Sequence, residues 1–363
     1  MTNAETRDAV LQADLEKICG SDIGWERLSG KTVLVTGATG LIGREVILAL
    51  LAANRIHGLG IKICGLVRSP EKAQRIFGDL TERPELIFVK GDIVQPVETD
   101  EHIDFIIHLA SQTASKELVT HPVEAIDTAI AGTKNILELA RKNNCEGVVY
   151  ASSMEAYGNP GACDERTTED KLGYIDNLRV RSCYPEAKRM CENMCVCYAS
   201  EYGVKVSIAR LAQTFGAGVD KNEGRVFAQF ARSAMEKKDI VLHTAGRSYG
   251  NYCYTADAVT GLLTVMLSGV CAEAYNIVNE ACTMRIAEMA QLVSDKIAGG
   301  AIKTVFDIPE NSNTYGYAPD VELRLSGQKL MALGWRPEIA PDMVTMYNRL
   351  IDSFNTDTEL LSV

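Results

Sequence analysis

Short apolar runs alternate with longer stretches of helical spacing from Val33 to about Arg210. The runs are rich in valine, isoleucine and phenylalanine and contain few polar residues: Val33–Val35, Ile61–Val67, Leu86–Val89, Phe105–Leu109, Gly147–Ala151 and Val204–Arg210. Such runs are typical of parallel strands that are buried on both faces. Val123–Arg141 is one of the stretches whose apolar residues repeat with the period of a helix. The alternation predicts an α/β fold with a doubly wound parallel sheet.

The first strand leads into a glycine-rich turn. Gly37, Gly40 and Gly43 follow Val33–Val35, and Glu45–Ala53 is an unbroken series of good helix formers. Glycines in this position allow a tight turn and bring backbone N–H groups and a helix N-terminus close to a pyrophosphate. An ordinary glycine turn is the alternative. With a strand before it and a helix after it, the turn favours a Rossmann-type dinucleotide site.

The second half of the chain loses the strict alternation. From about residue 216 onward short strands and helices follow each other without a fixed order, which indicates a smaller substrate-binding lobe. Leu11, Leu15 and Ile18 have helical spacing and predict a helix before the first strand. The expected domains are a helical extension over 1–30, a Rossmann domain over 31–215 to which 240–260 returns, a C-terminal lobe over 216–355 and a frayed tail over 356–363.

Several residues that could bind a cofactor or take part in catalysis directly follow the predicted strands in the sequence. Arg68 follows the second run, where these folds place an acid for the ribose 2′-hydroxyl of NAD or an arginine for the 2′-phosphate of NADP. A solvated arginine at a strand end is an equally good interpretation. Ser153, Glu155 and Tyr157 follow the fifth run and would share one face if that segment were extended.

Tyr184 and Lys188 are four residues apart in a predicted helix and therefore neighbours on one face. A phenol with a pKa near about 10 is a poor base at neutral pH. A fixed ammonium group beside it and a cationic nicotinamide nearby would favour the phenolate, so we expect Lys188 and the bound cofactor together to lower the pKa of Tyr184. Alone, such a pair is usually an exposed helix face; the glycine turn upstream gives it weight as an acid–base pair.

The composition of the chain excludes several classes of binding partner and site. The chain of 363 residues has a net charge of −11, which argues against nucleic acid or an anionic membrane surface as a partner. Its eleven cysteines form no regular framework and no secretory signal precedes them, which indicates free thiols in the cytoplasm. Cys191, Cys195 and Cys197 have no nearby histidine to complete a metal site, so we expect small core residues and no metal. The longest apolar run, Val46–Ala53, is too short to cross a bilayer.

Taken together, the glycine triad, Asp92, the strand end His108–Ala110, Ser153 and the Tyr184/Lys188 pair resemble the extended short-chain dehydrogenase/reductase superfamily. More narrowly, the chain resembles the NAD-dependent epimerase/dehydratase family, which acts on nucleotide sugars. The resemblance covers about residues 31–350 and is strongest to UDP-glucuronate decarboxylases. It is carried by Ser-Met-Glu-Ala-Tyr-Gly, Arg-Ser-Cys-Tyr-x-x-x-Lys-Arg, Gly-Arg-Val-Phe and Leu-Gly-Trp-x-Pro.

The resemblance implies a role for each matching residue. Tyr184 would take the proton of the sugar 4-hydroxyl, Ser153 would bond the same oxygen, and Lys188 would hold the nicotinamide ribose. Glu155 lies where dehydratases and decarboxylases keep a glutamate. Gln213, Arg225 and Arg247 would bind the substrate. The cofactor, NAD with NADP as the alternative, would be bound by Gly37, Thr39, Gly40, Leu41, Ile42, Gly43, Arg68, Asp92, Ile93, Leu109, Ala110, Ser111, Tyr184 and Lys188.

Three positions depart from the family pattern. Gly250 replaces an arginine that commonly clamps the substrate diphosphate, and Arg247 is the candidate to stand in for it. Met154 replaces the aspartate that many 4,6-dehydratases use as an acid, which counts against simple dehydration. Ala129 replaces a usual asparagine in the helix before the fifth strand.

The resemblance thus implies an enzyme that oxidises a nucleotide sugar at C4 and then epimerises, dehydrates or decarboxylates it. A reductase of a small carbonyl that uses NADP is one alternative, suggested by Arg68; a dinucleotide-sensing protein without turnover is another. The helical patterns Val123–Arg141 and Tyr184–Ala199 match those that form a dimer interface in the family, so we expect a homodimer.

Overall fold

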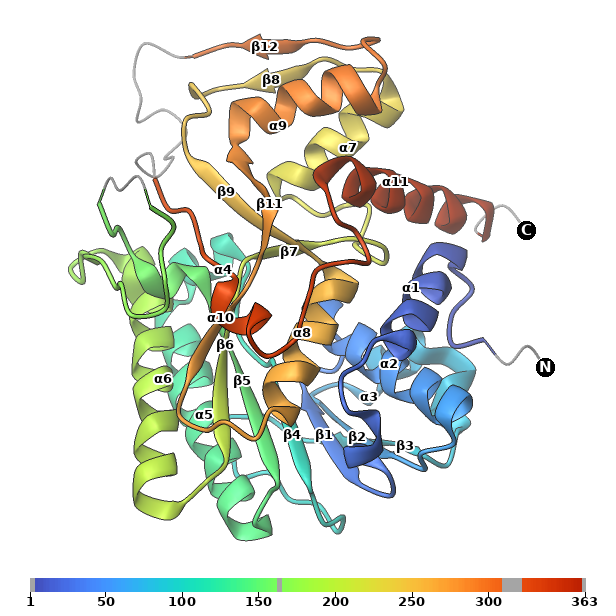
Figure 1. Ribbon diagram of the computed structural model, residues 1–363, viewed down its shortest axis with the longest axis vertical. Helices are drawn as coiled ribbons and strands as arrows, with labels where there is room; N and C mark the ends of the chain where they lie inside the picture. Colours follow the sequence, from blue (N-terminus) through green and yellow to red (C-terminus); the bar gives the residue numbers. More distant parts are fainter. Residues whose placement is uncertain (1–3, 162–164, 309–321, 361–363) are drawn as a thin grey trace.

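The computed structural model describes residues 4–161, 165–308 and 322–360. Its main body is a seven-stranded parallel sheet with helices on both faces (Figure 1). In spatial order the strands are β10 (Ala274–Ile277), β6 (Val206–Leu211), β5 (Gly147–Ser153), β4 (Phe105–His108), β1 (Thr32–Thr36), β2 (Lys62–Val67) and β3 (Leu86–Lys90). The order reverses between β4 and β1, and such a switch point leaves a crevice at the carboxyl ends of the strands. The predicted doubly wound fold is confirmed.

Each face of the sheet has its own apolar core, because successive side chains of a strand point to opposite sides. Val33 and Val35 pack with residues of three helices, α2 (Leu41–His57), α3 (Pro70–Phe77) and α8 (Thr255–Leu267). Leu34 packs on the other side with residues of α5 (Pro122–Asn143) and α6 (Cys183–Tyr202); the short α4 (Ser115–Thr120) precedes α5. All five residues of β1 are buried, which explains why its sequence shows no polar alternation.

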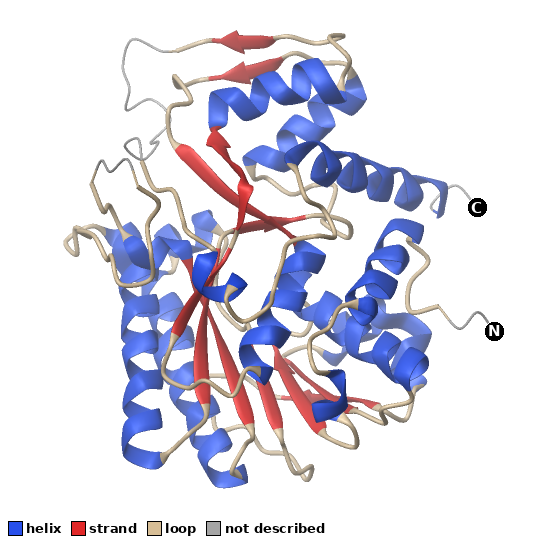
Figure 2. Cartoon of the chain, viewed as in Figure 1, coloured by secondary structure: helices blue, strands red, loops and turns tan. Residues whose placement is uncertain are grey.

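A smaller lobe covers the carboxyl edge of the sheet (Figures 1 and 2). Its three-stranded sheet has the order β11 (Asn279–Arg285), β9 (Tyr249–Tyr254) and β7 (Gln213–Phe215). A two-stranded parallel sheet joins β8 (Ile240–Leu242) to β12 (Thr304–Phe306). The helices of this half are α7 (Val226–Glu236), α9 (Ile286–Leu292) with a π-helical turn at Val293–Ile297, α10 (Gln328–Met331) and α11 (Met343–Leu360).

Two expected boundaries differ from the structure. The segment that rejoins the main sheet is α8 with β10, residues 255–277, rather than 240–260, because β8 pairs with β12 inside the smaller lobe. The helix α11 extends to Leu360, into the stretch from residue 356 where the sequence predicts a frayed tail. Four short 3₁₀ turns complete the description: Trp25–Leu28, Gly78–Glu82, Met154–Tyr157 and Val180–Ser182.

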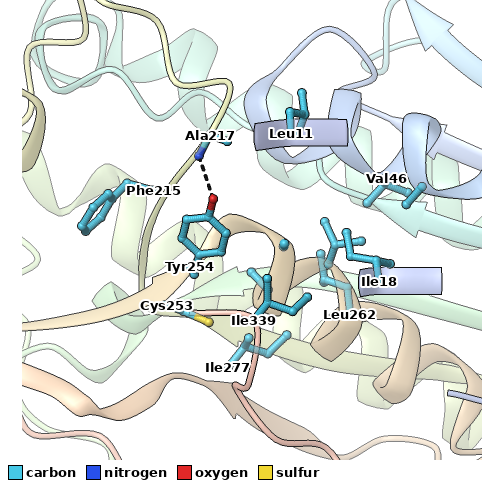
Figure 3. Close-up of a cluster of buried hydrophobic side chains, with 14 of the residues drawn as sticks. Leu11, Ile18, Val46, Phe215, Ala217, Cys253, Tyr254, Leu262, Ile277 and Ile339 are labelled. Carbon is cyan, nitrogen blue, oxygen red and sulfur yellow. Dashed lines mark hydrogen bonds between the residues drawn. The ribbon is translucent and has the colours of Figure 1, made fainter. Parts of the chain in front are cut away.

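The expected N-terminal helix is present as α1 (Ala9–Gly20) and is packed into the core. Leu11 and Ile18 belong to the same cluster of buried side chains as Val46, Leu262 and Tyr254 (Figure 3). Asp14 of α1 is fully buried; it accepts a hydrogen bond from the Tyr254 hydroxyl at 2.6 Å. It also pairs with Arg349 of α11, so this buried carboxylate joins the first helix to the last.

Candidate active site

The glycine turn between β1 and α2 has no space for side chains. Gly37 has a φ of +70°, and a Cβ there would lie 3.0 Å from the backbone nitrogen of Ala110. A Cβ at Gly43 would lie 2.2 Å from the carbonyl oxygen of Gly37. The Gly40 N–H donates to that same oxygen at 2.9 Å, and α2 begins at Leu41, the next residue. The backbone and the helix N-terminus are therefore open to a close ligand, as a dinucleotide pyrophosphate requires.

A cavity of about 340 Å³ lies beside this turn, at the carboxyl ends of β2, β3 and β4. Six residues that the sequence predicts for the cofactor line it: Gly37, Arg68, Asp92, Ile93, Ala110 and Ser111. The sequence did not predict the residues that α4, α5 and the segment joining them contribute, among them Glu117, His121, Glu124 and Thr128. Turn glycines, a helix N-terminus and an adjoining cavity together fit a dinucleotide.

Two side chains fix the ends of β1 and β4 beside this cavity: the Thr36 hydroxyl, which the sequence analysis did not name, and His108, which it named only as part of a strand end. The Thr36 hydroxyl oxygen accepts the backbone N–H groups of Leu109 and Ala110 at 3.1 Å each. Its own proton therefore goes to His108 Nδ1, 2.8 Å away. Burial, with the nearby Lys188 charge, lowers the pKa of His108 to about 3, so the ring is neutral and bonds Thr133 through Nε2 at 3.2 Å.

Tyr184 and Lys188 occupy the first turns of α6 and face the end of β5. The Lys188 ammonium is buried, donates to the Ala151 carbonyl at 2.7 Å and lies 5.6 Å from the centroid of the Tyr184 ring. Burial lowers the pKa of Lys188 to about 8. The predicted pair is therefore brought together with the strand end that carries Ser153.

The pKa of Tyr184 is raised in the protein chain itself. Burial and the negative charge of Glu155 raise the pKa of Tyr184 to about 12, although a hydrogen bond with Ser153 and the charge of Arg181 act in the opposite direction. The sequence predicts a pKa lowered by Lys188 together with a cationic nicotinamide, and that prediction concerns the protein with its cofactor. In the chain itself the Lys188 ammonium donates to a backbone carbonyl, and burial of the phenol dominates.

The segment after β5 is not extended, which corrects the expectation from the sequence. Met154–Tyr157 forms a 3₁₀ turn. The backbone N–H of Glu155 donates to the Ser153 hydroxyl oxygen at 3.2 Å and so caps the start of this turn. Tyr157 therefore points into the core, where its hydroxyl donates to Asn276 at 2.8 Å. Glu155 points elsewhere: its side chain is 40% exposed and its Oε1 accepts from Arg181 Nη2 at 2.9 Å.

A buried polar network supports this turn from behind. Arg210 of β6 makes two hydrogen bonds with Glu192 of α6, at 2.9 and 2.7 Å, and its guanidinium lies 4.8 Å from the Tyr157 ring centroid. Ser152 donates to the same carboxylate at 2.5 Å. Arg189 adds hydrogen bonds to the carbonyl groups of Ala156 and Tyr157. Strand end, turn and helix are thus held in one arrangement.

The predicted substrate residues of the smaller lobe have local partners. Gln213 begins β7 and pairs with Tyr252 across the sheet. Arg225 precedes α7 and is bonded to Glu223 at 2.8 Å. Arg247 is exposed, and its carbonyl accepts from Arg285.

Gly250 is buried on β9. A Cβ there would lie 2.4 Å from the ring of Tyr252, so this tyrosine fills the space that a side chain at position 250 would need. Arg285 lies 4.5 Å and Arg324 5.6 Å from the centroid of the neighbouring Tyr249 ring. Sequence reasoning named neither of these two arginines.

Most of the described cysteines are buried, as expected for small core residues. Ten cysteines lie in the described ranges and all are free thiols. Cys191 and Cys195 are buried, whereas Cys197 is exposed, so the expected core role fails for that residue. Within the residues described, no cluster of histidine, cysteine or acidic side chains has metal-binding geometry. In the same ranges, every helix is too short or too polar to span a bilayer.

Comparisons with known proteins agree with this geometry. A model of the NAD dependent epimerase/dehydratase family matches residues 33–278. The chain is 28% identical over 330 residues to UDP-glucuronic acid decarboxylase 1 of Danio rerio, covering 91% of this chain and 74% of that protein. It is 27% identical over 312 residues to UDP-glucuronic acid decarboxylase 6 of Arabidopsis thaliana, covering 86% and 85%.

Solved structures support the fold. The dTDP-glucose 4,6-dehydratase of Bacillus anthracis, in complex with NAD, has a TM-score of 0.72 at 19% identity and covers 91% of this chain and 98% of its own. The UDP-glucose 4-epimerase of Thermotoga maritima, with UDP-glucose, has a TM-score of 0.71 at 21% identity and covers 90% and 99%.

Proposed function

Because the chain belongs to the NAD dependent epimerase/dehydratase family, we propose that it modifies a nucleotide sugar through transient oxidation at C4. The observation that carries the proposal is the meeting of Ser153, Tyr184 and Lys188 at the carboxyl edge of the sheet that also holds the glycine turn. The decarboxylase relatives and the epimerase and dehydratase structures support a sugar joined to a nucleotide as the substrate.

The glycine turn and the adjoining cavity would hold the dinucleotide. Gly37, Gly40 and Gly43 would bring backbone N–H groups to the pyrophosphate, with Asp92 at the adenosine end of the cavity. A bound NAD supplies the acceptor for the hydride of C4 and a positive charge near the reacting oxygen. Arg68 lines the same cavity. If its guanidinium binds a 2′-phosphate, the cofactor is NADP, which is the alternative to NAD.

Three side chains of this chain would handle the 4-hydroxyl. Tyr184 would remove its proton, and Ser153, already bonded to Tyr184, would hold the same oxygen. Lys188 would orient the nicotinamide ribose from its buried position on α6. Since burial keeps the pKa of Tyr184 high, the positive charges nearby decide whether the phenolate forms.

Glu155 would act after the oxidation. A 4-keto group acidifies the C5 hydrogen and stabilises the carbanion of a decarboxylation, and either outcome needs an acid–base group near C5. Glu155 lies two residues after the end of β5 and is half-exposed beside Tyr184, which supports that role. A positioned acid–base group contributes roughly 100- to 10,000-fold in rate. A pure 4-epimerase would not need it.

Substrate grip and assembly complete the proposal. We infer that Arg225 and Arg247, with Gln213, bind the nucleotide diphosphate in place of the arginine absent at Gly250, since guanidinium groups bind phosphate in a bidentate manner. An Arg247→Ala variant with an unchanged KM would contradict the part given to Arg247.

We also infer a homodimer through α5 and α6. The outer faces of these helices and of α4 expose four apolar side chains: Val119, Val123, Ile126 and Met190.

The function is tested with the purified protein and a panel of UDP-, dTDP-, CDP- and GDP-sugars. We expect reduced nicotinamide to form with at least one of them, followed by a product identified by mass spectrometry. Tyr184→Phe should abolish the reduction, whereas Glu155→Gln should reduce the cofactor and then stall by at least roughly 100-fold.

Tyr174→Phe is the matched control, because Tyr174 is 72% exposed on a neighbouring loop and should leave turnover unchanged. No reduction with any sugar, together with NADPH-dependent turnover of small carbonyls, would favour the reductase. Dinucleotide binding without any turnover would favour a sensor. Wild-type rates in Glu155→Gln would indicate an epimerase.

A further inference from the structure

Arg181 lies beside both Tyr184 and Glu155, which act one after the other in the proposed function. The proposed function assigns no role to Arg181 itself. It lies in the 3₁₀ turn Val180–Ser182, which leads directly into α6. Its Nη2 donates to Glu155 Oε1 at 2.9 Å. Its guanidinium carbon lies 5.6 Å from the centroid of the Tyr184 ring. One side chain therefore spans the candidate base and the candidate acid–base group of the later step.

The two partners of this ion pair are placed by separate contacts. The turn that carries Glu155 is fixed to α6 by Arg189, which donates to the Ala156 carbonyl at 2.7 Å. The turn that carries Arg181 is fixed by Ser182, whose hydroxyl donates to the Asp176 carbonyl at 2.5 Å. Because each backbone is held independently, the ion pair sets the direction of two side chains rather than the fold of the loop.

Stability does not explain the pair. The side chains of Arg181 and Glu155 are 38% and 40% exposed, and ion pairs this accessible to water add little to the free energy of unfolding. Electrostatics next to Tyr184 do explain it. The charge of Glu155 disfavours the Tyr184 phenolate, and the charge of Arg181 favours it. Among the described residues, the charged or titratable groups with a recorded interaction with Tyr184 include Glu155, Arg181, Lys188 and Tyr150.

We propose that Arg181 is a positioning residue that orients the Glu155 carboxylate at the sugar site and offsets its charge beside Tyr184. The inference rests on the proposed function, because only there do Tyr184 and Glu155 act one after the other. When a substrate excludes water from the site, the pair becomes stronger, since charges interact more strongly away from water. Arg181 thus permits a carboxylate next to a tyrosine that must ionise.

Arg181→Gln is the first test, with the nucleotide sugar that the wild-type protein turns over. We expect turnover to fall on the order of 100-fold, the cost of a misplaced catalytic group, with KM unchanged. Reduced nicotinamide should accumulate, as in Glu155→Gln. Arg181→Lys should recover part of the rate, because it restores the charge without the planar guanidinium. Arg181→Gln/Glu155→Gln should be no slower than Glu155→Gln alone, because both changes remove one function.

The pH profile of the oxidation step provides a second readout. Loss of the Arg181 charge should raise the pKa of Tyr184 and move the acidic limb of the profile to higher pH, and Glu155→Gln should move it to lower pH. Arg179→Gln is the matched control. Arg179 lies two residues earlier, is 69% exposed and forms a similar ion pair, with Asp176 at 2.9 Å. It should retain the wild-type rate and profile.

Each result decides a separate point. Arg181→Gln with the rate and profile of Arg179→Gln would overturn the inference while the proposed function stands. A rise in KM alone would make Arg181 a substrate-binding residue, and multiplied losses in the double variant would separate it from Glu155; both outcomes also overturn the inference. A wild-type protein that never reduces its cofactor with any nucleotide sugar would instead overturn the proposed function, and the inference with it.

Discussion

Replacement of Glu192 by leucine would leave a buried guanidinium without its carboxylate. Glu192 and Arg210 are 7% and 4% exposed, and the change removes both of their hydrogen bonds. Among the described residues, Arg210 would keep the Glu169 carbonyl, at 2.7 Å, and the face of the Tyr157 ring. Removing one partner of a buried pair costs about 3–5 kcal/mol. Loss of the Ser152 hydrogen bond adds about 1 kcal/mol.

The assay is urea unfolding followed by circular dichroism, on Glu192→Leu, Arg210→Met and the double variant. An apolar pair of similar volume often replaces a buried ion pair at little cost, so the double variant should lie within about 2 kcal/mol of the wild type. Arg179→Gln, which breaks the exposed pair with Asp176, should cost at most about 1 kcal/mol. A single Glu192→Leu variant as stable as Arg179→Gln, or a double variant as unstable as the single one, would refute the reasoning.

Three further predictions concern the cofactor, pH and assembly. Gly43→Ala places a Cβ 2.2 Å from a carbonyl oxygen, so NAD affinity measured by calorimetry should fall at least roughly 100-fold. Gly20→Ala is the control, because its Cβ would have no described atom within 4 Å, and it should bind NAD normally. Equal affinities of the two variants would contradict the prediction. Burial raises the pKa of Asp14 from 3.8 to about 6, so the folded state binds the extra proton and stability should fall, by at most roughly 3 kcal/mol, as pH rises through that window. Asp14→Asn should flatten this slope in urea midpoints without abolishing it, because Asp257 has a similar raised pKa of about 6; an unchanged slope would contradict the assignment. Val123→Glu should yield monomers in light scattering while Val241→Glu, at a comparably exposed valine of β8, remains dimeric; a wild-type monomer would contradict the proposed dimer.

Sequence patterns predicted the elements whose signals are local. The first strand, glycine turn and helix were found because burial on both faces leaves a pure apolar run and because the turn admits only small residues. The helix α1 was found from the spacing of its apolar residues. Tyr184 and Lys188 were correctly paired because helical geometry alone makes residues four apart neighbours.

What the sequence did not reveal depends on contacts between distant or very short segments. The alternation of Ser153 and Glu155 suggested an extended chain, but the Ser153 side chain accepts the Glu155 N–H and a four-residue 3₁₀ turn follows. Four residues are too few to show a helical period. Arg181 meets Glu155 across 26 positions, and β8 pairs with a strand more than sixty residues later, so neither contact leaves a periodic trace.

The junction of Asp14 with Arg349 has a consequence for how the protein is made. These residues are 335 positions apart, and a ribosome adding about 5–20 residues per second needs on the order of half a minute to supply the second after the first. Throughout that interval Asp14 lacks its arginine partner, although Val46 and Leu262, which pack with the apolar side chains of α1, are synthesised before Arg349. The first helix can therefore pack on α2 early, but the ion pair that joins it to the last helix forms only after residue 349 has been added.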